Sequence, residues 1–138
     1  MYEYKCKIIR VVDGDTVDVD IDLGFDIIMS NERVRIYGID APESRTRDLV
    51  EKKFGLAAKE RVLELLPEGS YQTIKTFLDG KGKFGRVLGD FVVANSTLTT
   101  ILIDEGHAVE YYGQSKDLIL EQHLINRQRL IDNGTVTL

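Results

Sequence analysis

The sequence predicts a mainly β protein with helices (an α+β fold), in which five strands form one barrel and three α-helices accompany it. Segments in which apolar and charged residues alternate recur along the chain, and this period is typical of half-exposed strands. Other segments carry apolar residues at helical spacing and end at glycine or proline. With 138 residues, 43% of them hydrophobic, the chain is long enough for one compact core, so a single domain over residues 1–138 is expected.

The first three strands are expected in the N-terminal part of the chain. In residues 4–12, apolar side chains alternate with charged ones, and in residues 17–21 valine and isoleucine alternate with aspartate. A third strand begins near residue 33. Residues 23–32 are interpreted as a long hairpin connection or ribbon, longer than is usual for such a barrel.

Helices and two more strands are expected in the rest of the chain. A polar loop leads to a helix over residues 56–66, and strands follow at residues 71–77 and 87–93. A short helix capped by Asn95 or Ser96 stops at Gly106. A longer helix capped by Ser115 ends at Gly134, with Leu120, Leu124 and Ile131 on one face. Five strands with a helix between the third and the fourth predict an OB-type barrel.

Composition narrows the class of protein. The net charge of −5 argues weakly against broad electrostatic attraction to nucleic acid, although local basic patches exist. No apolar run is long enough for a membrane span, so no membrane partner is expected. Cys6 is the single cysteine, so it is expected to be a small buried side chain. The location stays open: cytoplasmic if Met1 is the native start, secreted if a signal peptide was removed.

Two aspartates are candidate metal ligands. Asp15, in the stretch DGDT, shares the parity of Val17 and Val19 and would point to the apolar face, where a lone carboxylate is costly without a cation or donor. Asp40 follows a strand and the break at Gly38. Two carboxylates with backbone oxygens suit a hard cation such as calcium or magnesium. The alternative is that Asp15 belongs to a simple Asx turn.

Arg35, Glu43 and Arg86 complete a set suited to phosphodiester hydrolysis. Guanidinium groups can hold the non-bridging oxygens, and a carboxylate can orient or deprotonate water. In a regular strand Arg35 and Asp40 would face opposite sides, so the break at Gly38 must rotate Asp40 toward Arg35. The alternative for each arginine is a surface ion pair.

The runs IIRVVDGDTVDV, RVRIYGIDAPE, KFGRVLG and LIDEGHAVEYY, in this order, resemble the staphylococcal nuclease (thermonuclease-like) family from Tyr4 to about Arg129. The resemblance implies an OB-fold barrel with three helices. It also implies a calcium-dependent enzyme that hydrolyses DNA and RNA with little sequence specificity and leaves 3′-phosphate ends.

The resemblance also implies roles for individual residues. Asp15 and Asp40 would ligate calcium, Ala41 would offer its backbone carbonyl, and Glu43 would act on the attacking water. Arg35 and Arg86 would bind the scissile phosphate. Lys83, Tyr111 and Tyr112 are expected to bind substrate, with one of the tyrosines stacking on the terminal base; packing is the alternative for both tyrosines.

The sequence departs from the family pattern in three respects. Ala41 replaces a common threonine, Phe84 replaces a common tyrosine, and the chain is acidic, which should weaken binding to long polymers. The expected partners remain DNA and RNA, preferably single-stranded, acted on by a monomer. A non-catalytic OB-type module that binds single-stranded nucleic acid or protein is the alternative. His107 and His123 are interpreted as structural or exposed.

Overall fold

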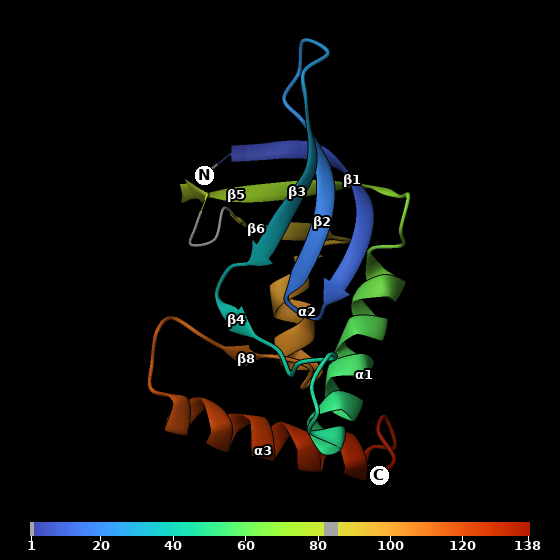
Figure 1. The fold of residues 1–138 in the computed structure, drawn as a ribbon, viewed down its shortest axis with the longest axis vertical. Helices are drawn as coiled ribbons and strands as arrows, with labels where there is room; N and C mark the ends of the chain where they lie inside the picture. Colours follow the sequence, from blue (N-terminus) through green and yellow to red (C-terminus); the bar gives the residue numbers. More distant parts are fainter. Residues whose placement is uncertain (1, 82–85) are drawn as a thin grey trace.

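Five strands close into the predicted barrel in the computed structural model, which describes residues 2–81 and 86–138 (Figure 1). The hydrogen-bonded order is β3-β2-β1-β5-β6, and a parallel pairing of β3 with β6 closes the cylinder. The barrel strands are β1 (Tyr2–Asp13), β2 (Thr16–Asp22), β3 (Ile28–Ile36), β5 (Tyr71–Lys81) and β6 (Val87–Val93). The OB-type α+β architecture expected from the order of elements is therefore confirmed.

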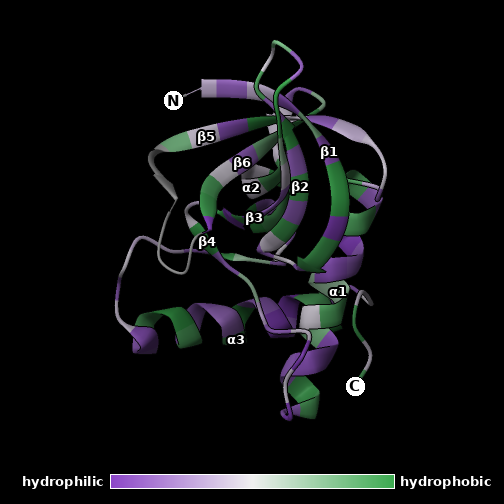
Figure 2. Ribbon diagram, turned by 45° about the horizontal axis from the view of Figure 1, so that its top comes forward, coloured by the Kyte–Doolittle hydropathy of each residue, from purple (hydrophilic) through white to green (hydrophobic). Residues whose placement is uncertain are grey.

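Alternating residues of the strands fill the barrel. Along β2, Val17, Val19 and Ile21 are buried in the main core, where they meet Phe91 of β6. Hydrophobic and hydrophilic residues alternate along the strands in Figure 2, as expected for a sheet with one face in the core. Cys6 is buried among them, and burial raises the pKa of its thiol to about 12.

The helix after the third barrel strand is longer than the sequence predicted. It is α1 (Leu49–Leu65), and Asp48 caps it by accepting hydrogen bonds from the backbone of Val50 and Glu51. The expected start at residue 56 is wrong, because Gly55 lies inside the helix rather than in a loop before it. A glycine inside a helix costs about 1 kcal/mol relative to alanine, so it calls for a packing reason, which the site provides.

The remaining elements surround the end of the barrel that lies toward α3 in Figure 1. The short strands β4 (Ile39–Asp40) and β8 (Val109–Glu110) pair with each other, and β7 (Ser96–Thr97) extends β6. Thr97, not Asn95 or Ser96, caps α2 (Leu98–Asp104). Ser115 caps α3 (Lys116–Asp132), as predicted. Among the described residues, no helix combines the length and apolar character that a membrane crossing would need.

The connection between β2 and β3 is a hairpin that projects beyond the barrel, away from α3 (Figure 1). Phe25 at its tip is 99% exposed. Phe25 and Asp26 both have positive φ, of 56° and 62°, in the left-handed region where most side chains are disfavoured. The strand predicted to begin near residue 33 therefore begins at Ile28, and residues 23–27 alone form the protruding turn. This turn is far from the residues that gather at the other end of the barrel (Figure 1).

Candidate active site at the β3–β4 turn

The turn after β3 brings Arg35 and Asp40 together. Gly38 adopts a φ of +84°, a conformation that glycine tolerates better than other residues, and the chain reverses there into β4. The Arg35 Nη2 atom lies 3.8 Å from Asp40 Oδ1, and its Nη1 atom lies 3.4 Å from Asp15 Oδ2. Asp40 is therefore rotated to the Arg35 side, as the sequence required, and Asp15 approaches from the turn between β1 and β2.

Asp15 lies in the tight turn between β1 and β2 and is held by several donors. Its Oδ2 accepts the backbone N–H of Ala41 at 3.1 Å, and its Oδ1 accepts the Thr16 hydroxyl at 3.0 Å. Burial raises the pKa of Asp15 above its ordinary value, and the nearby Asp40 charge raises it further, while Arg35 and the Ala41 N–H oppose the shift. The carboxylates of Asp15 and Asp40 thus lie close together in a partly desolvated part of the structure.

Asp13 fixes the loop that carries Glu43. Its Oδ1 accepts hydrogen bonds from both the backbone N–H and the hydroxyl of Ser44, which is buried. Asp13 and Asp15 therefore both accept hydrogen bonds from residues 41–44, and do more than close a local Asx turn. The carboxylates of the DGDT stretch hold the loop that follows β4.

Two glycines let α1 approach this loop closely. A Cβ atom at Gly55 would lie 2.1 Å from the Glu43 carbonyl oxygen, far inside contact distance. A Cβ atom at Gly14 would lie 2.8 Å from the Ala58 methyl and 3.1 Å from the Ala41 methyl. The glycine inside α1 is thus explained, because the helix packs directly against the backbone of Glu43.

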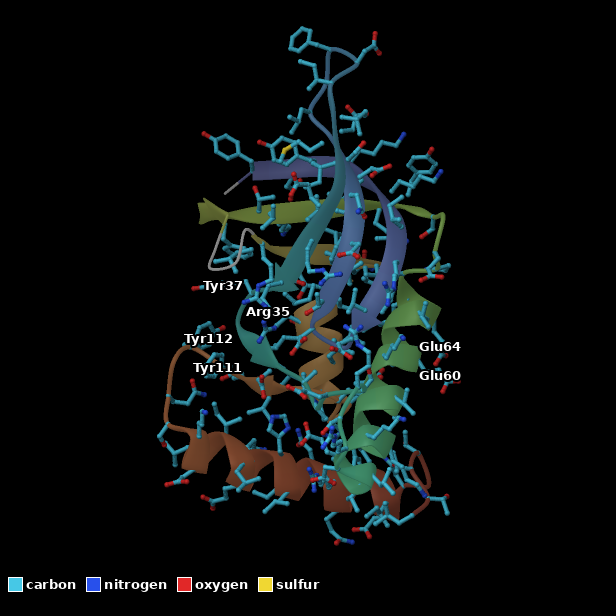
Figure 3. All side chains as sticks on the ribbon, viewed as in Figure 1. Arg35, Tyr37, Glu60, Glu64, Tyr111 and Tyr112 are labelled. Atoms are coloured by element: carbon cyan, nitrogen blue, oxygen red, sulfur yellow. The ribbon has the colours of Figure 1, made fainter. Side chains whose placement is uncertain are left out.

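Most of the predicted site residues border one open cleft of about 660 Å³ between the barrel and α3, although Asp15 is not among the residues that line it. Arg35, Glu43 and Arg86 line it together with Asp40 and Ala41. Figure 3 shows Arg35 on the side of the barrel where Tyr111 and Tyr112 lie, while Glu60 and Glu64 lie on the outer side of α1. The cleft combines guanidinium groups that can bind phosphate with carboxylates that can bind a cation or water.

A family model of staphylococcal nuclease homologues matches residues 33–130, which include most of the cleft. The chain belongs to this family. The match, the barrel and the cleft agree with the resemblance drawn from the four sequence motifs.

Curated relatives of this staphylococcal nuclease homologue bear nuclease names. A micrococcal nuclease of Shigella flexneri is 29% identical over 93% of the chain, which covers 72% of that relative. Endonuclease YhcR of Bacillus subtilis is 28% identical over 80% of the chain, and endonuclease YncB of the same organism is 27% identical over 86%. The chain covers only 9% of the length of YhcR and 54% of that of YncB.

The carboxylate oxygens of Asp15 and Asp40 are the type of ligand that a hard cation such as calcium prefers. Within residues 2–81 and 86–138, no group of three His, Cys, Asp or Glu side chains is placed to hold a metal ion. Calcium uses six to eight oxygen ligands, so the Ala41 carbonyl and water would have to complete a site built on two carboxylates. The Asp15 side chain is only 14% exposed, and this partial burial favours a cation, because a positive charge there would offset the desolvation of the carboxylate.

Of the two substitutions relative to the family pattern, the structure describes Ala41 but not Phe84. Ala41 is buried, and its methyl would lie 3.1 Å from a Cβ atom at Gly14, so it packs at the base of the loop. Lys83 and Phe84 lie outside the described residues. The substrate-binding role predicted for Lys83 therefore stays a prediction.

Tyr111 and Tyr112 follow β8, and both line a small cavity with Arg35. Tyr111 also lines the main cleft, whereas Tyr112 lies beside Tyr37 with ring centroids 5.9 Å apart. The Tyr37 ring in turn stacks on Phe77 at 4.4 Å. Tyr112 also covers Gly38, where an added Cβ would meet its hydroxyl at 2.9 Å. Packing against Gly38 and Tyr37 thus explains part of the role of the Tyr112 side chain, whereas the Tyr111 side chain can contact a ligand in the cleft.

Sequence analysis missed His123 as a residue of the site. Its Nε2 atom lies 2.8 Å from Asp40 Oδ2, although 83 positions separate the two residues. His123 lines the cleft from α3 together with Arg127 and Lys116. The spacing of Lys116, His123 and Arg127 corresponds to one helix face, a pattern visible in the sequence, but only the fold shows that this face meets β4.

Proposed function

We propose that this chain is a calcium-dependent nuclease that hydrolyses phosphodiester bonds of DNA and RNA with little sequence specificity. The observation that carries the proposal is the position of the Arg35 guanidinium, within 4 Å of both Asp15 and Asp40, in a cleft that Glu43 and Arg86 also line. Membership of the staphylococcal nuclease homologues and the nuclease names of the relatives support the reaction class.

Each residue then has a chemical task. Asp15, Asp40 and the Ala41 carbonyl would hold calcium, which neutralises phosphate charge when bound. Arg35 and Arg86 would bind the non-bridging oxygens, on which negative charge accumulates during cleavage. Glu43 would orient the attacking water or take its proton. The products would carry 3′-phosphate ends.

The proposed substrate range follows from the kind of contact. Arginine–phosphate contacts carry no base identity, so cleavage should be tolerant of sequence and should include both DNA and RNA. Single strands should be preferred, because the exposed Tyr111 ring beside the cleft can stack on an unpaired base. One chain supplies all these groups, so the proposed active unit is a monomer.

The test is a plasmid-nicking and single-strand cleavage assay with calcium or with chelator. Wild-type protein should cleave only with calcium. Arg35→Lys should lower the rate about 100- to 1000-fold, because a point charge cannot replace a bidentate fork. Glu43→Gln should lower the rate strongly while nucleoside bisphosphate binding persists. Glu64→Gln, on the outer side of α1 (Figure 3), is the matched control. Undiminished cleavage in chelator would contradict the calcium assignment.

A second candidate function is binding of single-stranded nucleic acid without cleavage. The cluster of Tyr37, Phe77 and Tyr112 next to the cleft favours it, since aromatic side chains on a barrel surface are typical stacking platforms. The same assay separates the two functions. A binding module would retain oligonucleotide affinity and show no calcium-dependent turnover.

A further inference from the structure

His123 reaches Asp40 from the opposite side of the cleft. It lies in the middle of α3, its side chain is 14% exposed, and its Nε2 atom lies 2.8 Å from Asp40 Oδ2. A contact this short joins the covering helix directly to a carboxylate of the proposed cation site. On its other side, the Asp40 carboxylate lies 3.8 Å from the Arg35 guanidinium.

The two Asp40 oxygens face different groups. Oδ1 faces Arg35, whose guanidinium also contacts Asp15, whereas Oδ2 faces His123. Because His123 occupies Oδ2, Oδ1 is the Asp40 oxygen left to share a cation with Asp15, which also lies beside Arg35. In this arrangement the imidazole would lie behind the ligand and not in the place of the cation.

α3 makes a second contact with the small β4–β8 sheet that carries Asp40. Asn126, one helical turn after His123, donates its side-chain N–H to the Ala108 carbonyl at 3.2 Å. The next residue, Val109, pairs with Asp40 in the two-stranded sheet of β4 and β8. One helix thus contacts both strands of this small sheet, which connects the position of α3 to the direction in which the Asp40 carboxylate points.

We infer that His123 is a positioning residue, which donates a hydrogen bond to Asp40 Oδ2 and thereby aims Oδ1 at the cation. The inference rests on the proposed function, because it requires a cation at Asp15 and Asp40. Side chains that orient a metal ligand in this way typically contribute 10- to 100-fold to metal affinity. His123 acts through Asp40 and touches neither the cation nor the substrate.

The experiment is isothermal titration of calcium into the full chain, with His123→Phe, His123→Gln and a control. The phenylalanine variant keeps a ring and loses the donor, whereas glutamine keeps a donor. Leu124→Phe is the control, because Leu124 neighbours His123 on the same helix but its side chain is exposed. We expect calcium to bind about 10- to 100-fold more weakly to His123→Phe, with partial recovery in His123→Gln and no change in Leu124→Phe.

Cleavage rates at saturating calcium give the second readout. A positioning role predicts that the rate of His123→Phe recovers to within a few-fold of wild type once calcium saturates, so the loss lies in affinity. Equal calcium affinity in wild type and both His123 variants would overturn the inference, and so would tighter binding, which would mean that the imidazole competes with the cation. If the wild type neither binds calcium nor cleaves, the proposed function fails and this inference falls with it.

Discussion

The two long helices of this protein border the same site but are attached in different ways. Both α1 and α3 contain 17 residues. α1 buries Phe54, Gly55, Ala58 and Val62, and its backbone packs directly on that of Glu43. α3 buries only Asn126 and Leu130. Polar side chains of α3, His123 and Asn126, contact Asp40 and the Ala108 carbonyl.

The difference lies in how each side of the cleft is held. Close packing of α1 on the Glu43 loop leaves no room for displacement. The α3 side depends on individual hydrogen bonds such as His123–Asp40 and Asn126–Ala108, which contribute about 0.5–1.5 kcal/mol each. Leu118, Leu120, Leu124 and Ile125 of α3 are exposed, so α3 gains little from apolar burial along its first three turns.

The largest effect is expected where α1 meets Glu43. Gly55→Ala should destabilise the protein by at least about 2 kcal/mol, because overpacking here outweighs the gain of about 1 kcal/mol in helix propensity. Cleavage should fall as well, since the Glu43 loop must move. Urea denaturation together with turnover measures both effects, with Glu60→Ala on the outer face of α1 as control. A more stable variant would show that propensity prevails and that the contact is loose.

Loss of the hydrogen bond from Asn126 of α3 to Ala108 should have a smaller and more local effect on stability. Asn126→Ala leaves the buried Ala108 carbonyl without its side-chain donor, which typically costs about 1–3 kcal/mol. Because α3 has few other buried contacts, hydrogen exchange should accelerate in α3 and leave α1 protected. Equal acceleration in both helices would contradict the difference between them.

A pH-dependent effect is expected at His107, next to the ion pair between α1 and the end of α2. Burial lowers the pKa of His107 below its ordinary value of 6.5, with Arg61 and Arg129 lowering it further and Glu105 and Glu64 opposing the shift. The unfolded chain therefore binds the proton more readily. The resulting stability is fully present above pH 6.5 and is lost as the pH falls through the lowered folded pKa.

His107→Leu should remove this contribution. Thermal unfolding of wild type and variant between about pH 7.5 and pH 5 measures it, because the unfolded imidazole titrates in this range. We expect the melting temperature of the wild type to decline more steeply than that of the variant over this interval. Parallel curves would mean that His107 titrates alike in the folded and unfolded chains.

The smallest effect is expected on the exposed side of α3. Leu118→Gln should change the free energy of unfolding by less than about 0.5 kcal/mol, as is usual at exposed positions. Leu130→Ala, in the small core with Phe54, should cost about 2–5 kcal/mol by contrast. Chemical denaturation of both variants completes the comparison. A large loss from Leu118→Gln would mean that this leucine has a buried partner.

Much of the fold and part of the site could be predicted from local pattern. Strand alternation and the order of elements identified the barrel, because burial of one face imposes a period of two on any strand. The odd spacing of Arg35 and Asp40 required a reversal at Gly38, and the structure has it. Both predicted tyrosines line a cavity beside Arg35, and Tyr111 also lines the main cleft; their substrate-binding roles stay predictions.

What the sequence by itself determined about this protein is therefore the set of strands and the cluster around the β3–β4 turn, where every cause lies within a few residues. What only the tertiary structure decided is how the helices meet that turn. Gly55 resembles a helix breaker until the Glu43 backbone is placed against it. His123 resembles an ordinary helix residue until α3 crosses β4, 83 positions away in the chain. Contacts of this kind depend on packing between distant segments, and no local period encodes them.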